Sequence, residues 1–216
     1  MKRLSFETSG LSARDYARLK RLDTPVKIQD VLDALPMNWE KKGETLQSPA
    51  RTLRARKAHC FEGALFAAAT LWIHGEPPLL MNLSSRLGSG DYDHVVALYK
   101  RGGRWGAISK TNHPSIRFRD PVYKTLRELA LSYFHEWFRN TNGEKTLECY
   151  SGPITLARDP YWVAAAHDLW ELDKAFEVRK HYSLVPKRQW RYVRRADAME
   201  LRAGRLEEWA KSDPRT

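Results

Sequence analysis

The sequence predicts an α+β fold in which one buried helix packs on a small, mainly antiparallel sheet, with extra helices at both ends. The run CFEGALFAAATLWI at residues 60–73 has apolar side chains on every side of a helical wheel, so this helix should be buried all round. Short apolar runs bounded by glycine and proline follow it, as expected of strands. Helical patterns flank these runs at both ends of the chain, which favours the α+β class.

The length and composition indicate one domain. The chain has 216 residues and a hydrophobic content of 42%, enough to bury a sizeable core. No linker composition divides it. We expect a single domain over residues 1–216, with its core at about 25–155 and a basic, helical C-terminal extension at 156–216.

Three segments precede the buried helix. One helix should follow Ser12, a suitable cap, and a second should span 27–35, where apolar side chains share one face. Residues 39–56 are charged and contain the pair Ser48-Pro49, so we expect a loop that leads into Cys60.

The expected strands lie at 78–83 (PLLMNL), 94–99 (HVVALY), 105–109 (WGAIS) and 147–151. The second and third are separated by RGGR, which predicts a β-hairpin with His94 opening its first strand.

The second half of the chain suggests further helices. Asp120-Pro121 resembles a helix cap followed by a first-turn proline, which predicts a helix over 122–138. Asp159-Pro160 predicts another that runs to about Arg179. Residues 179–205 then hold nine Lys or Arg and two acidic residues.

Charge, cysteine content and missing motifs limit the possible functions. The net charge of +11 suits an anionic partner, and nucleic acid is a weakly supported example. Two cysteines cannot form a disulfide framework, and no CxxC, HExxH or phosphate-loop motif is present, so we expect no cofactor and no metal. No signal peptide or membrane-length apolar segment is visible, and we expect a cytoplasmic protein with no membrane partner.

Cys60 is the candidate nucleophile. It begins the buried helix, where unpaired amides and the positive end of the helix dipole lower the pKa of a thiol. A nucleophilic cysteine also needs a base, and the base needs a group that orients it. His94 at a strand start is the candidate base, and Ser109 or Asn112 at the exit of the next strand is the candidate third member. The alternative is that Cys60 has no catalytic role and is a small core residue.

These residues give the chain a resemblance to the transglutaminase-like superfamily. The resemblance lies in AHCFEGALFAAATL around Cys60, DYDHVVALY around His94, and GGRWGAIS, over roughly residues 25–155. The run RWGAISKTNHPSIRFRDPVY, followed by RELALSYFHEW, is most similar to small bacterial transglutaminase-like proteins. The resemblance implies a papain-like fold and a cysteine hydrolase or acyltransferase that acts on an amide or ester, in a protein or peptide, through a thioester.

The sequence departs from the family pattern at two positions. Ser109 stands where the family aspartate would fall, and Val96 replaces an aromatic residue that often follows the histidine. Ser109 cannot supply a negative charge to an imidazolium, so Asn112 is the other candidate for the third position. Gln29 is considered as an oxyanion donor but is expected to be a solvated helix residue, and His59 is expected to be a loop residue.

A non-catalytic function is the alternative hypothesis. In it, the fold is an interaction module, and the basic segment 179–205 binds an anionic partner through arginines and interleaved aromatic residues.

Overall fold

The computed structural model describes residues 2–206 and is an α+β fold with an antiparallel sheet. Within this range the helices are α1 (Phe6–Ser9), α2 (Ala13–Lys20), α3 (Pro25–Ala34), α4 (Pro49–Ala55), α5 (Cys60–Ile73), α6 (Leu126–Leu131), α7 (Tyr161–Ala164), α8 (Trp170–Glu177) and α9 (Ala198–Gly204). Short 3-10 helices are η1 (Pro114–Ile116), η2 (Phe134–Glu136) and η3 (Lys187–Tyr192).

The strands form one sheet in the order β4-β3-β2-β1-β5-β7, and β6 also pairs with β1. They are β1 (Leu79–Ser85), β2 (His94–Arg101), β3 (Arg104–Ile108), β4 (Arg119–Tyr123), β5 (Leu147–Ser151), β6 (Ile154–Thr155) and β7 (His181–Ser183). Every pairing between these strands is antiparallel. The predicted hairpin is confirmed, with Leu98 opposite Ala107.

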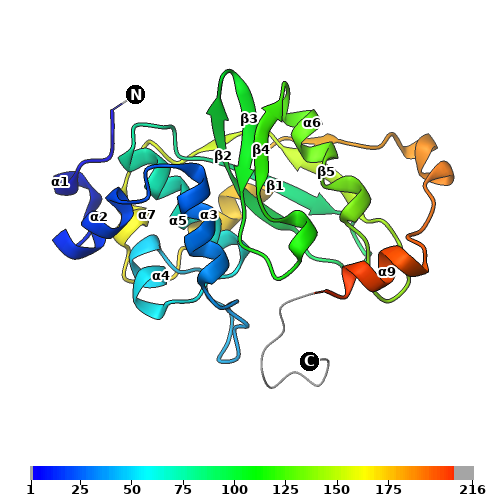
Figure 1. Ribbon diagram of the computed structural model, residues 1–216, viewed down its shortest axis with the longest axis horizontal. Coiled ribbons are helices and arrows are strands. Elements are labelled where there is room, and N and C mark those ends of the chain that lie inside the picture. Colours follow the sequence, from blue (N-terminus) through cyan, green and yellow to red (C-terminus); the bar gives the residue numbers. More distant parts are fainter. Residues whose placement is uncertain (1, 207–216) are drawn as a thin grey trace.

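Both faces of the sheet are covered. In Figure 1, α1 to α4 and α7 lie to one side, and α5 lies between them and the sheet, while α6 and α9 lie on the other side. Helix α5 packs on β2 and β1, and one apolar cluster joins it to Val95, Ala97 and Tyr99 of β2. Val96 and Leu98 of the same strand belong to a second cluster on the opposite face, with residues of α6 and η2. The strand alternation thus builds two cores.

The buried helix is confirmed with the bounds that the sequence predicts. All residues of α5 except Cys60 are buried. Gly63 is the point of closest approach, because a Cβ built there would lie 2.4 Å from the Cβ of Lys110. A glycine in the first turn therefore lets the end of β3 come close to the start of α5, where Cys60 lies.

The helix predicted over 122–138 is present only in part, as α6 and the short η2, and its predicted start is wrong. Asp120 and Pro121 lie in β4, where Tyr123 pairs with Trp105, and α6 starts only after the Thr125 cap. Strand β4 is at the edge of the sheet, where a proline without an N–H is tolerated.

The loop predicted over 39–56 contains α4. Ser48 caps this helix by accepting a hydrogen bond from the amide of Arg51, and Pro49 occupies its first turn. The pair read as a loop signal is therefore a helix start.

The single helix predicted from 159 to about 179 is two helices, α7 and α8. The chain is extended at Ala165, and its carbonyl accepts a hydrogen bond from Ser48. Asp168 then pairs with Arg51 at 2.7 Å, and the amide of Leu169 binds the carbonyl of Leu46. These tertiary bonds hold the segment between the two helices against the α4 region.

The C-terminal extension is not purely helical. Strand β7 pairs with β5, so residues 181–183 extend the sheet, and Trp162, Leu169 and Phe176 join the core around α5. Leu4, Leu11 and Leu19 from the N-terminal end belong to the same core. Residues 207–216 of the predicted extension lie outside the described residues.

Candidate active site

The start of α5 is fixed by the residue before Cys60. His59 is the N-cap, and its ring Nδ1 lies 3.3 Å from the amide of Phe61. Glu62, three residues later, accepts a hydrogen bond from the backbone amide of His59 at 3.0 Å. This reciprocal arrangement is a capping box, and it places the Cys60 thiol on the first helical residue.

Glu62 is a fully buried carboxylate with its own set of donors. It accepts hydrogen bonds from Asn38 Nδ2, the hydroxyl of Thr45 and the amide of Gln47, in addition to the amide of His59. The shortest of these is 2.8 Å, from Thr45. A buried polar side chain of this kind needs hydrogen-bond partners, and the residues at 38–47 supply most of them, so this loop is built around Glu62.

The ring of His59 lies beside a backbone carbonyl and two carboxylates. Its Nε2 lies 2.9 Å from the carbonyl oxygen of Thr45, 3.5 Å from Glu62 and 3.8 Å from Glu40. Burial lowers the pKa of His59, but hydrogen bonding to Cys60, the negative charges of Cys60 and Glu62, and the Thr45 carbonyl outweigh it and raise the pKa to about 9.

The proton that His59 gains must reside on Nδ1, because Nε2 already donates to Thr45. Nδ1 is also within reach of the Phe61 amide, and it can accept a hydrogen bond from that amide only while it is unprotonated. At 3.3 Å that bond is long and weak, so the charge of Cys60 decides in favour of the imidazolium.

His94 lies at the first position of β2 and is almost completely buried. Its Nε2 is 2.5 Å from the hydroxyl oxygen of Ser109, and its ring meets Trp137 edge-on. Ser109 is fixed in turn by Gln29, whose side-chain amide accepts from the Ser109 N–H and donates to the Ser109 carbonyl. Helix α3 therefore positions the residue that orients His94.

Cys60 is accordingly poised as a thiolate. Burial raises its pKa, but hydrogen bonds from His59 and His94 and the charges of both rings lower it to about 5. Cys149 behaves oppositely, since burial raises the pKa of its thiol. The two cysteines are free, and they differ in the direction of their pKa shifts.

Three of the four candidate residues form one constellation: Cys60, His94 and Ser109. Asn112 lines a cavity that also borders Cys60 and His94. The sequence leaves the third position open between Ser109 and Asn112. In the structure, the hydroxyl of Ser109 is the group bonded to Nε2 of His94. Gln29 is not solvated as expected, because both atoms of its amide are bonded to the Ser109 backbone.

His59 is the residue that sequence reasoning misjudged. The sequence predicts a loop residue at this position, whereas in the structure His59 caps α5 and carries the second imidazole beside Cys60. The signal was the spacing His59-x-x-Glu62 directly before an apolar run, which matches the N-cap and third-residue positions of a capping box.

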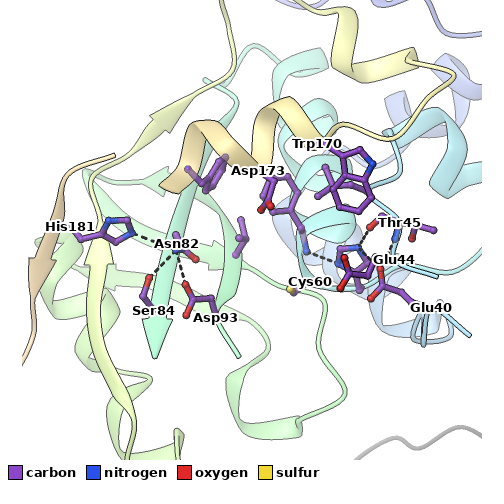
Figure 2. Close-up of a pocket in the computed structure, with 15 residues that line it drawn as sticks. Glu40, Glu44, Thr45, Cys60, Asn82, Ser84, Asp93, Trp170, Asp173 and His181 are labelled. Carbon is purple, nitrogen blue, oxygen red and sulfur yellow. Dashed lines mark hydrogen bonds and ion pairs between the residues drawn. The ribbon is translucent and has the colours of Figure 1, made fainter. Parts of the chain in front are cut away.

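Two cavities meet at Cys60. One has a volume of about 530 Å³ and lies between β1, the start of β2 and α8. The other, of about 610 Å³, lies toward His94, Asn112 and His113. Cys60, His59, Glu40 and Asp93 border both. In Figure 2 the Cys60 sulfur lies between Asn82, Ser84, Asp93 and His181 on one side and Glu40, Glu44 and Thr45 on the other. A substrate that crosses Cys60 can therefore occupy space on both sides of it.

The basic segment 179–205 is partly packed on the domain. Trp190 contacts Phe134 and lies under the guanidinium of Arg86, at 5.2 Å from the ring centroid. Tyr192 is 69% exposed.

Within residues 2–206, no helix is long and apolar enough to cross a membrane, and no group of three or more His, Cys, Asp or Glu side chains is placed to hold a metal ion.

Comparison with known proteins gives no family assignment. No protein-family model matches the chain, and no curated protein has a sequence that matches it.

Proposed function

We propose that the chain is a cysteine-dependent acyltransferase or amidase with a transglutaminase-like, papain-like arrangement, in which Cys60 attacks an amide or ester carbonyl. The observation that carries the proposal is the Cys60 thiol between two histidines, with its pKa lowered to about 5, where two cavities meet. At neutral pH such a group is a thiolate, the reactive form of cysteine.

The reaction proceeds through a thioester. The Cys60 sulfur forms a bond to the carbonyl carbon, and the carbonyl electron pair moves to oxygen. The tetrahedral intermediate then collapses, the bond from carbon to the leaving nitrogen or oxygen breaks, and His94 donates a proton to the leaving group. Water or an amine attacks the thioester, gives a proton back to His94 and releases Cys60 as the thiolate.

The two histidines have different roles. His59 holds a pKa of about 9 and carries the positive charge that balances the thiolate, so it is a poor base for activating water at neutral pH. His94 is bonded to a neutral hydroxyl and is assigned the proton transfers. Glu62, behind His59, supplies the negative charge that Ser109 cannot supply behind His94.

The oxyanion is assigned to the start of α5. The first amides of a helix have no acceptor within the helix. The amide of His59 is bonded to Glu62, and the amide of Phe61 loses its acceptor when Nδ1 of His59 is protonated. We assign the backbone amide of Cys60, next to the attacking sulfur, as an oxyanion donor.

The test is the detection of an acyl-enzyme. Incubation with 4-nitrophenyl acetate and a panel of amide and ester probes is expected to give an acyl adduct at Cys60, read by peptide mass spectrometry and removed by hydroxylamine. The adduct should form in Cys149→Ser and be lost in Cys60→Ala. If no probe acylates Cys60 specifically, the proposal is wrong and the non-catalytic interaction module is the better account.

A further inference from the structure

We propose that the cavity between β1, β2 and α8 is a subsite for a cationic group of the substrate, an ammonium or guanidinium, held at Asp93. As a substrate site it rests on the proposed function, whereas cation binding beside Cys60 can be measured without any turnover. The cation is recognised here, and the carbonyl that Cys60 attacks lies elsewhere on the same molecule.

The charge of the cavity is opposite to that of the whole chain. Glu40, Glu44, Asp93 and Asp173 are among the residues that line it, and no lysine or arginine of the described part does so. The complete chain carries a net charge of +11. The four carboxylates outnumber the one imidazolium assigned at this cavity, that of His59. The recess is therefore negative in a positive protein, and such a recess concentrates cations at the nucleophile.

One wall of the cavity has more hydrogen-bond acceptors than donors. The Nδ2 of Asn82 lies within reach of Ser84 Oγ at 2.8 Å, Asp93 Oδ2 at 3.2 Å and His181 Nε2 at 3.4 Å. Its two hydrogens thus face three acceptors, of which only the Ser84 hydroxyl has a hydrogen of its own to donate. His181 donates from Nδ1 to the carbonyl of Arg179, which leaves Nε2 as an acceptor in the neutral ring.

Asn82 adds a further unsatisfied acceptor to this wall. The residue is only 8% exposed, and its Oδ1 has no hydrogen-bond partner in the described structure. Its amide orientation is fixed because the opposite one would point Oδ1 at the carboxylate of Asp93. Buried polar groups without partners are uncommon in proteins and call for a specific explanation.

Asp93 is positioned but not neutralised. Its Oδ1 accepts the amide of Ser85 at 2.9 Å and its Oδ2 accepts from Asn82, and both donors are uncharged. Among the described residues, no ion pair joins Asp93 to a lysine or arginine. Figure 2 shows Asp93 beside Asn82 and Ser84, on the opposite side of Cys60 from Glu40 and Glu44. A group that donates N–H bonds and carries positive charge complements this wall, whereas a carboxylate or phosphate would be repelled.

The first experiment compares matched alkylating probes. 2-Chloroacetamides with an N-aminoalkyl chain of two to five carbons are paired with N-alkyl analogues of equal length. In each reaction the thiolate sulfur bonds to the methylene carbon and chloride leaves. We expect the best ammonium probe to alkylate Cys60 about tenfold faster than its neutral partner, since a hydrogen bond to a charged group has this order of effect.

Two variants test whether Asp93 causes the difference in alkylation rate between the charged and the neutral probe. Asp93→Asn should reduce the ratio of rates to near one while the neutral probe still reacts, and Asp120→Asn, which removes an exposed charge in β4, should keep it. Equal ratios in the parent protein and Asp93→Asn, or the same loss in Asp120→Asn, would overturn the subsite. The ratio is independent of acyl-enzyme formation, so a failed acylation test and a failed subsite give different results.

A competition assay covers the case in which Asp93→Asn does not fold, and it separates two sources of the cation. In the unmodified protein, spermidine or N-acetyl-lysine amide should slow alkylation of Cys60 by the neutral probe, whereas N-acetyl-norleucine amide should not. Protection by the polyamine or by the amino-acid amide supports the subsite and indicates the source. Absence of protection by both would refute it.

Discussion

Replacing Glu62 by leucine is expected to lower the free energy of unfolding by several kcal/mol, the largest stability effect of any single change at this site. Leucine removes the acceptor for the donors of Asn38, Thr45, Gln47 and His59, and each buried donor left unpaired costs about 1–3 kcal/mol. Because domains are stable by only about 5–15 kcal/mol, the variant could fail to fold. Urea denaturation followed by circular dichroism measures the change.

Two further variants distinguish this cause from a general effect of mutation. Glu62→Gln keeps one side-chain carbonyl oxygen and nearly the same volume, so its loss of stability should be clearly smaller. Glu44→Gln is an exposed change in the same region and should shift stability by less than about 0.5 kcal/mol. A Glu62→Leu protein as stable as the parent would show that the carboxylate does not organise the 38–47 loop.

Replacing His94 and replacing His59 are expected to have different effects on acylation and deacylation. His94→Ala removes the group assigned to proton transfer, so hydrolysis of the thioester should slow by about 10²–10⁴-fold. The acyl-enzyme of an activated ester should still form, because 4-nitrophenolate leaves without a proton, and it should accumulate. Rapid quench and mass spectrometry would follow its formation and decay.

His59→Ala should act mainly on the thiolate. It removes the imidazolium that balances the charge of Cys60, so the pKa of Cys60 should rise and acylation at pH 6 should slow more than acylation at pH 9. If both variants slowed acylation and deacylation equally at every pH, the division of roles between the two histidines would be wrong.

The elements that the sequence predicted well depend on local patterns. The bounds of α5 follow from an unbroken apolar run between a charged segment and Gly75, and the hairpin of β2 and β3 follows from β-branched runs around two glycines. His94 and Ser109 were placed at the ends of those strands for the same reason. Their side-chain contact could be suspected from the sequence, but only the structure shows that Ser109 is the residue at Nε2 of His94.

The misread segments are those in which a cap signal competes with tertiary contacts. Asp120-Pro121 resembles a helix start, but an edge position in the sheet accepts the proline and the pairing of Tyr123 with Trp105 holds the strand. The helix expected to reach residue 179 is interrupted where Asp168 and Leu169 bond to the distant Arg51 and Leu46. No local pattern encodes a partner more than 100 residues away.

The pH dependence of alkylation of Cys60 by iodoacetamide, with Cys149 quantified in the same digests, tests most directly whether Cys60 is held as a thiolate. The pKa of Cys60 is lowered and that of His59 is raised to about 9, so the thiolate–imidazolium pair exists between pH about 5 and about 9. The pair's contribution to stability is lost as the pH falls through the Cys60 pKa and as it rises through the His59 pKa.

Alkylation of Cys60 is expected to rise with a midpoint near pH 5 and to be complete at neutral pH, while Cys149 is expected to react only in alkaline solution. A midpoint near the ordinary thiol value of about 8.5, or equal reactivity of the two cysteines at pH 7, would contradict the claim that the two histidines hold Cys60 as a thiolate.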